Sequence, residues 1–210
     1  MSWMLSLSLA QAADRPVKPT EATEEPASPV SGVSLYLRFV GEAWDEPELG
    51  RVYRPNALMG GAGVVIGVHR WAQIDFEVAY ERMAGQHIDR DSLEPIDKQA
   101  TLELAPISLL VEGRVPFERG HVYLGAGPTA TVFKEEHESF TVFEDESLAT
   151  SVTSGTKIGA EVRGGVRIDL AVEPVSLELG VGRRFQKDPG LDGGFDLAAW
   201  RATAGLGLSF

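Results

Sequence analysis

Apolar and polar residues alternate strictly over long stretches of this chain from residue 33 onward. In residues 33–39, 61–68 and 74–81, every second side chain is apolar, largely Val, Leu, Ile or Phe. Alternation with a period of two over this length is typical of a β-strand with one apolar and one polar face. The same pattern recurs in residues 101–112, 121–132, 157–168, 175–185 and 198–210. The sequence therefore predicts an all-β fold of eight strands, each about 10 to 13 residues long.

The connections between these segments alternate between short and long. The short ones span 70–72, 113–120 and 169–174, and the long ones span 44–59, 83–100, 133–156 and 186–197. This order predicts an eight-stranded antiparallel up-and-down transmembrane β-barrel with short periplasmic turns and long extracellular loops. No helical periodicity lies between the strands, which excludes a βαβ fold. Within 101–112 the alternation changes phase near Pro106, which predicts a bulge there.

Glycine indicates which face of the barrel points inward. Eleven of the 23 glycines fall on the polar face, at positions 61, 63, 67, 125, 127, 159, 165, 180, 182, 205 and 207. The interior of an eight-stranded barrel is only wide enough for side chains to fill, and glycine makes room there for long neighbours. We therefore expect the polar face to point inward. The alternative is a soluble lipocalin-like barrel, in which the apolar face would line a ligand cavity.

Charges on the polar face are nearly balanced. This face carries Glu42, Asp75, Glu77, Glu81, Glu103, Glu112, Glu161 and Glu178 against Arg38, Lys157, Arg163, Arg167, Arg184 and Arg201. Enclosed charges require partners of opposite sign. The sequence thus predicts an interior ion-pair network of Arg38, Glu42, Asp75, Glu77, Glu81, Glu103, Glu161, Arg163, Arg167, Glu178 and Arg201. The apolar face bears almost no charge, apart from Arg82 and Arg183 near strand ends.

The amino-terminal residues differ in composition from the rest of the chain. Residues 3–10 are apolar and are followed by Ala-Gln-Ala at 10–12, which predicts a signal peptide over residues 1–12. The pattern has no basic residue before the apolar run, which an upstream start codon would explain. Residues 13–32 are rich in proline and polar residues, which predicts a disordered linker. The barrel domain is expected to span residues 33–210.

With these features, the chain resembles the small OmpA-type outer-membrane barrels of the porin-like family. The likeness rests on the terminal strand 202–210 (ATAGLGLSF), on residues 121–128 (HVYLGAGP) and on the secretion signal. The resemblance implies location in a Gram-negative outer membrane with the N-terminus in the periplasm. It also implies that Phe210 is an assembly signal that the barrel-assembly machinery recognises. Aromatic residues near strand ends suit two interfacial girdles, with Tyr80, Phe185 and Trp200 at one end and Trp71, Phe117 and Phe210 at the other.

The third long connection is strongly acidic. It contains Glu135, Glu136, Glu138, Glu144, Asp145 and Glu146. Carboxylates suit divalent cations, so one hypothesis is a cation bridge from this acidic loop to lipopolysaccharide; the alternative is a solvated acidic loop. The net charge of −12 argues against a nucleic-acid partner.

The sequence offers no catalytic, cofactor-binding or metal-binding set. The chain has no cysteine, and His87 and His137 fall in long loops near Ser92 and Ser139 without the fixed geometry that a nucleophile and its base require. We therefore expect no enzyme and no cofactor, and predict a structural or surface-interaction role. The alternatives are a narrow channel for ions or small solutes and a lipid-acting enzyme.

Overall fold

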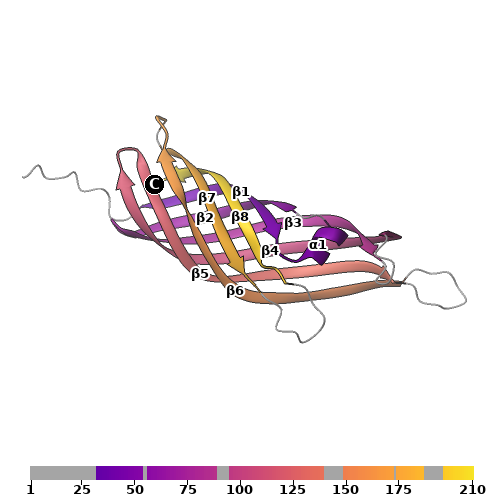
Figure 1. The fold of residues 1–210 in the computed structure, drawn as a ribbon. Helices are drawn as coiled ribbons and strands as arrows, with labels where there is room; N and C mark the ends of the chain where they lie inside the picture. Colours follow the sequence, from indigo (N-terminus) through magenta and orange to yellow (C-terminus); the bar gives the residue numbers. More distant parts are fainter. Residues whose placement is uncertain (1–31, 54–55, 89–94, 140–148, 173, 187–195) are drawn as a thin grey trace, which may run out of the picture.

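The computed structural model describes residues 32–53, 56–88, 95–139, 149–172, 174–186 and 196–210. These residues form a closed antiparallel barrel (Figure 1). Its strands are β1 (Val33–Trp44), β2 (Asn56–His69), β3 (Ala72–Ile88), β4 (Pro95–Phe117), β5 (Gly120–Ser139), β6 (Ala149–Asp169), β7 (Val175–Phe185) and β8 (Ala199–Ser209). A short helix, α1 (Pro47–Val52), lies between β1 and β2. Within the described ranges, no helix has the length and hydropathy of a membrane span.

Each strand pairs with the next along the chain, and β1 also pairs with β8. This last ladder closes the sheet and places Leu35 opposite Leu208 and Glu42 opposite Arg201. Beside the short turns, the amide of Phe210 donates to the carbonyl oxygen of Val33 over 2.9 Å. The predicted eight-stranded, antiparallel, up-and-down fold is confirmed.

Strands β1, β7 and β8 have the predicted length, whereas β2–β6 are longer than the sequence predicts, with up to 23 residues in β4. The short connections are 70–71, 118–119 and 170–174, and the others are 45–55, 89–94, 140–148 and 186–198. The predicted loops 83–100 and 133–156 were too long because β3–β6 continue through most of them. Outside the hydrocarbon layer, an outward-facing strand residue has no need to be apolar, so these strand ends have the composition of loops.

Strands β3–β6 therefore rise beyond their neighbours as an open sheet (Figure 1). The β2–β3 ladder ends at the pair Gly60 and Tyr80, and the β6–β7 ladder ends at Ala160 and Phe185. Past these points, and within the described ranges, β3–β6 pair only with one another. We call this sheet the outer extension; it comprises residues 81–88, 95–104, 129–139 and 149–159.

The predicted change of phase near Pro106 was wrong. The β3–β4 register runs unbroken past this residue, and even-numbered side chains of β4 face inward from Leu102 to Glu112. Because the sequence predicts an inward-facing Glu103, it also predicts that its neighbours Leu102 and Leu104 face lipid. They instead point into a part of the interior that is itself apolar.

An apolar layer lies in the barrel interior at the end opposite the short turns. Its buried residues are Val40, Leu49, Tyr53, Ala57, Met59, Ala79, Met83, Ala100, Leu102, Leu104 and Leu197. We call this layer the apolar plug. Helix α1, which the sequence did not predict, contributes Leu49 to it and packs so close to β3 that a Cβ on Gly85 would lie 2.4 Å from the carbonyl oxygen of Val52.

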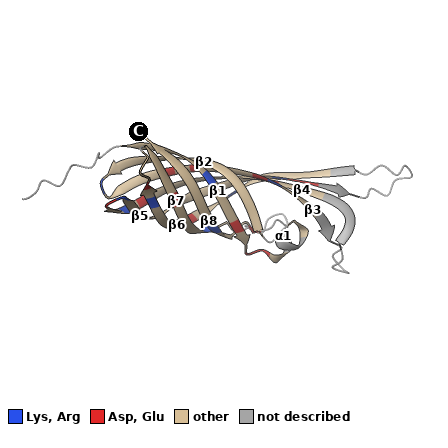
Figure 2. Ribbon diagram, turned by 90° about the horizontal axis from the view of Figure 1, so that it is seen from above, with Lys and Arg blue, Asp and Glu red and all other residues tan. Residues whose placement is uncertain are grey.

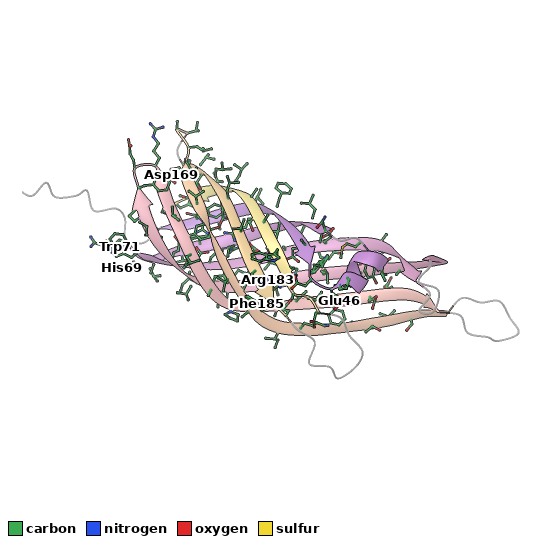
Figure 3. All side chains as sticks on the ribbon, viewed as in Figure 1. Glu46, His69, Trp71, Asp169, Arg183 and Phe185 are labelled. Atoms are coloured by element: carbon green, nitrogen blue, oxygen red, sulfur yellow. The ribbon has the colours of Figure 1, made fainter. Side chains whose placement is uncertain are left out.

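The outer face of the barrel is a continuous apolar surface. Leu37, Leu58 and Leu124 expose 71%, 70% and 67% of their surface, respectively. The six aromatic residues of the expected girdles are all exposed. Figure 3 shows Trp71 at the end with the short turns and Phe185 toward the other end. The polar side chains consequently lie inside.

Candidate functional site: a sealed charged interior

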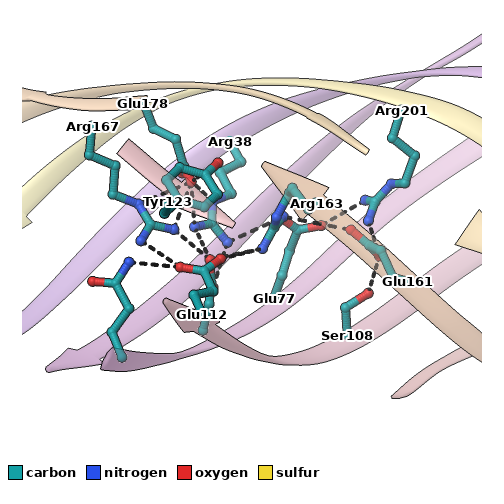
Figure 4. Close-up of polar contacts among 12 residues, drawn as sticks. Arg38, Glu77, Ser108, Glu112, Tyr123, Glu161, Arg163, Arg167, Glu178 and Arg201 are labelled. Carbon is teal, nitrogen blue, oxygen red and sulfur yellow. Dashed lines mark hydrogen bonds and ion pairs between the residues drawn. The ribbon is translucent and has the colours of Figure 1, made fainter. Parts of the chain in front are cut away.

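Five arginines and six carboxylates are buried inside the barrel. They are Arg38, Arg163, Arg167, Arg184, Arg201, Glu42, Asp75, Glu77, Glu112, Glu161 and Glu178, each at most 2% exposed. We call this set the charged core. Figure 2 shows that basic and acidic positions are interspersed along the barrel strands, and Figure 4 shows most of their contacts.

Asp75 of β3 is the centre of the charged core. Its Oδ2 accepts hydrogen bonds from Arg38 (2.7 Å), Arg163 (2.8 Å) and Arg167 (2.7 Å). Arg38 and Arg167 also donate to Glu178 of β7, over 2.7 and 2.8 Å. Arg38 and Arg167 therefore each neutralise carboxylates from two strands that are not neighbours in the barrel, β3 and β7, and a buried charge requires such partners.

Arg201 of β8 contacts three carboxylates in the part of the charged core that lies toward the plug. It donates to Glu77 over 2.7 Å and to Glu161 over 2.5 Å, and its Nε lies 2.9 Å from Glu42. Arg184 donates to the other oxygen of Glu42. Arg184 also donates to a main-chain carbonyl of the apolar plug over 3.2 Å, so the charged core and the plug are in direct contact.

At the other end, the charged core continues toward the short turns. Arg167 and Gln73 both donate to Oε2 of Glu112, each over 2.8 Å. The Gln73 amide nitrogen in turn lies 3.3 Å from a ring nitrogen of His121. The guanidinium carbon of Arg167 lies 4.2 Å from the ring centroid of Tyr123, a cation–π contact. Contacts between buried side chains thus run from the short turns to the plug.

Glycines of the inner face make room for these long side chains. A Cβ at Gly63 would lie 2.3 Å from an Arg38 nitrogen, and one at Gly125 would lie 2.5 Å from Glu112 Cγ. Gly120, the first residue of β5, has a φ of 146°, which favours glycine. The expectation that inner-face glycine serves packing therefore matches the geometry.

Nine of the eleven residues predicted for the interior network lie in the charged core, together with Glu112 and Arg184 of the polar face. Glu81 faces inward but is only half-buried. The assignment of Glu103 to the interior was wrong: it faces outward, 3.5 Å from the exposed Arg82. The error has the same origin as the false bulge, because the sequence placed the wrong face of β4 inside above Pro106.

Three residues of the predicted acidic loop, Glu135, Glu136 and Glu138, lie on β5 rather than in a loop. Glu135 accepts a hydrogen bond from the Tyr53 hydroxyl over 2.5 Å, and Glu136 lies 2.5 Å from the Lys134 ammonium. The side chains of Glu138, Glu144, Asp145 and Glu146 lie outside the described residues. Both described carboxylates already have partners within the chain, and the divalent-cation contact stays a prediction.

The remaining predicted positions lie near the two rims. Phe210 is 76% exposed at the end with the short turns. Figure 3 places His69 at that same end. The side chains of His87 and His137 lie outside the described residues.

No protein-family model matches the chain, and no curated protein matches it by sequence. Its structure is similar to that of the outer-membrane protein OprG from Pseudomonas aeruginosa. The TM-score is 0.60 over 86% of this chain and 96% of OprG, with 14% sequence identity. This chain has the fold of a small outer-membrane β-barrel. A major outer-membrane protein from Thermus thermophilus is similar too, with a TM-score of 0.57 over 85% of this chain and 99% of that protein, at 13% identity.

Proposed function

We propose that this protein is a closed, non-conducting outer-membrane barrel that acts at the cell surface through its outer extension. In the orientation that we propose, the short turns and the N-terminus face the periplasm, and the outer extension projects outside the cell. The observation that carries the proposal is the continuity of the buried interior, in which the charged core contacts the apolar plug directly.

The surface of the barrel supports a membrane location. Large apolar side chains face outward on every strand from β1 to β8. A soluble monomer rarely exposes a contiguous apolar surface of this extent, whereas hydrocarbon solvates it favourably. Exposed aromatic residues near both rims suit the two membrane–water interfaces.

The interior supports a role other than transport. An ion that crosses the lumen would have to displace guanidiniums, four of which each bind two or more carboxylates, and then enter the apolar plug. Removing one partner from a buried ion pair costs about 3–5 kcal/mol. An eight-stranded barrel whose inner side chains fill its lumen leaves no aqueous path. The competing function, a narrow channel, requires the contacts of Arg201 to rearrange.

Conductance in planar lipid bilayers tests the sealed lumen. The refolded protein, shown to be folded by a gel shift between unboiled and boiled samples, should give no discrete current steps at neutral pH. A wide diffusion porin inserted under the same conditions is the positive control. Reproducible ohmic steps from the protein alone would replace this proposal with the channel.

A charge scan of the outer face tests the membrane location. Leu179→Arg places a cation in the outward apolar band of β7 and should destabilise the barrel by about 2–4 kcal/mol in lipid vesicles. Thr156→Arg, on an exposed position of the outer extension, is the matched control and should change stability little. Equal tolerance of both substitutions, with folding in the absence of detergent or lipid, would indicate a water-soluble barrel.

The sequence also predicts contacts with lipopolysaccharide, divalent cations and the barrel-assembly machinery, and these stay predictions. The exposed Phe210 at the short-turn end is accessible to a periplasmic assembly factor, which supports its predicted role. Deleting Phe210 should lower the yield of folded barrel in cells and leave refolding in detergent unchanged. An unchanged yield in cells would contradict that role.

A further inference from the structure

Strand β6 pairs along its whole length on one side only. Its ladder with β5 continues to the pair Ser139 and Ala149, whereas its ladder with β7 stops at Ala160. Among the described residues, no strand accompanies residues 149–159 on the β7 side. Within the part of the chain that the structure describes, this stretch is therefore an edge of the outer extension.

The direction of the main-chain groups along β6 follows from its last hydrogen bonds. The amide of Asp169 donates to Arg119 on the β5 side, and the amide of Leu170 donates to Val175 on the β7 side. Because these directions alternate along a strand and the β5–β6 register is unbroken, even-numbered residues direct their N–H and C=O groups toward the β7 side. Among the described residues, the main-chain groups that Val152, Ser154 and Thr156 direct toward the β7 side therefore have no ladder partner.

This edge lacks the features that protect strand edges from added strands. Proteins block such edges with charged residues, proline or bulges. Residues 149–156 contain no charge and no proline, and they are rich in threonine, serine and valine. The one basic residue, Lys157, belongs to the inward-facing set and lies 5.7 Å from the Phe133 ring. The opposite edge strand of the extension, β3, carries the exposed Arg82, 3.5 Å from Glu103.

We infer that this edge, which we call the β6 edge, binds an extended segment of a partner protein as an added β-strand. The inference rests on the proposed surface role and names its site. Only another extended main chain can form hydrogen bonds with all the N–H and C=O groups that alternate along such an edge. Val152 and Ile158 are 54% and 77% exposed on the outward face, so the added strand should place β-branched or apolar side chains beside them.

The occupant is a different protein rather than a second copy in the same membrane. Two copies in one membrane are related by an axis along the membrane normal. Strands of such barrels tilt by about 35–45° from that normal, so the facing β6 strands of two copies would cross at about twice this angle. Strands that cross so steeply cannot share a ladder.

Amide hydrogen exchange of the full-length refolded protein tests the β6 edge. In the protein alone, the amides of Val152, Ser154 and Thr156 should exchange fast, and those of Thr153 and Gly155 slowly. The probe is a synthetic peptide of about ten residues that alternates threonine with valine and carries a lysine at each end. Its addition should slow exchange at the even-numbered residues alone. Slow exchange at these residues before the peptide is added would show that the edge is already covered and would overturn the inference.

Two variants at one position separate main-chain pairing from side-chain contact. Ser154→Pro removes an edge N–H without touching the ladder to β5, and it should weaken peptide binding by about tenfold or more. Ser154→Ala keeps the N–H and should bind like the unaltered protein. The gel shift on boiling confirms that both variants fold. Equal binding by both would overturn the inference while leaving the non-conducting barrel intact, because only conductance tests the latter.

Discussion

Replacing Arg163 with alanine should destabilise the barrel strongly. The Arg163 side chain on β6 is fully buried. It donates to Glu77 over 2.6 Å and to Asp75 over 2.8 Å, and it lies 3.8 Å from Glu112 and 4.0 Å from Glu161. The substitution leaves six buried carboxylates facing four guanidiniums.

The magnitude follows from the partners that remain. Removing one member of a buried ion pair costs about 3–5 kcal/mol, because the other charge stays buried. Asp75 keeps its bonds to Arg38 and Arg167, and Glu77 keeps its contacts with Arg38 and Arg201. Since no carboxylate is left without a cation, we expect the lower end of this range, about 3 kcal/mol.

Urea unfolding of the refolded barrel in lipid vesicles measures this loss. Arg183→Ala is the control, because Arg183 pairs with Asp45 at the partly exposed outer rim, where such a pair contributes about 0–1 kcal/mol. Adding Glu77→Gln to Arg163→Ala should cost less than the sum of the single changes, since it removes a carboxylate that has lost a partner. If Arg163→Ala costs no more than the control, the charged core does not stabilise the barrel as argued.

Two other perturbations address packing and pH. Gly63→Ala should lower the free energy of unfolding by about 1–3 kcal/mol, because the new methyl group meets the Arg38 guanidinium; Gly60→Ala on the same strand, where a Cβ meets no atom within 4 Å, should not, and equal urea midpoints would contradict this. Burial raises the pKa of the Tyr53 hydroxyl at the plug, and its hydrogen bond to Glu135 raises that pKa further. The folded protein thus favours the neutral phenol, so the stability that this contact contributes is complete below the ordinary tyrosine pKa of about 10 and falls as the pH rises above it. The advantage of the unaltered protein over Tyr53→Phe in urea should therefore shrink above about pH 10, and an advantage independent of pH would refute the assignment.

The membrane-crossing part of the fold could be predicted from alternation alone. Every outward residue there faces hydrocarbon and every inward residue faces a charged lumen, so the period-two signal has the same meaning on each strand. Leu35 and Leu37 on one face of β1, with Tyr36 and Arg38 on the other, illustrate this relation. The signal identifies the face of each residue, and the structure places those faces as expected.

The outer extension could not be predicted in the same way, because its surroundings differ. Lys134 and Glu136 occupy outward positions on β5 that would face lipid lower in the barrel, and in water they satisfy the strand equally well. On β4 the interior turns apolar, so Leu102 and Leu104 reverse the relation between polarity and face. Alternation identifies a strand. Whether its polar face points inward or outward depends on whether lipid, water or an apolar interior lies on each side.

The sequence also could not predict which arginine pairs with which carboxylate inside the charged core. Arg38 could be placed in the interior from its position on β1. Its partners, Asp75 and Glu178, are 37 and 140 residues away and reach it across the lumen. Which acid meets which base depends on ladder register and on the lengths of the side chains that meet at the axis, and neither is encoded locally.

This cross-lumen pairing constrains the order of events in assembly. Arg38 lies on the first strand and donates to Asp75, and Arg201 lies on the last strand and donates to Glu77. Both carboxylates belong to β3, and its neighbours β2 and β4 contribute no arginine to the charged core. A sheet that lacks its final strand would therefore carry uncompensated charge toward hydrocarbon, which makes partly inserted species high in free energy. Sealing of the β1–β8 seam and neutralisation of the interior must then occur together, so the chain enters the membrane as a nearly complete cylinder rather than strand by strand.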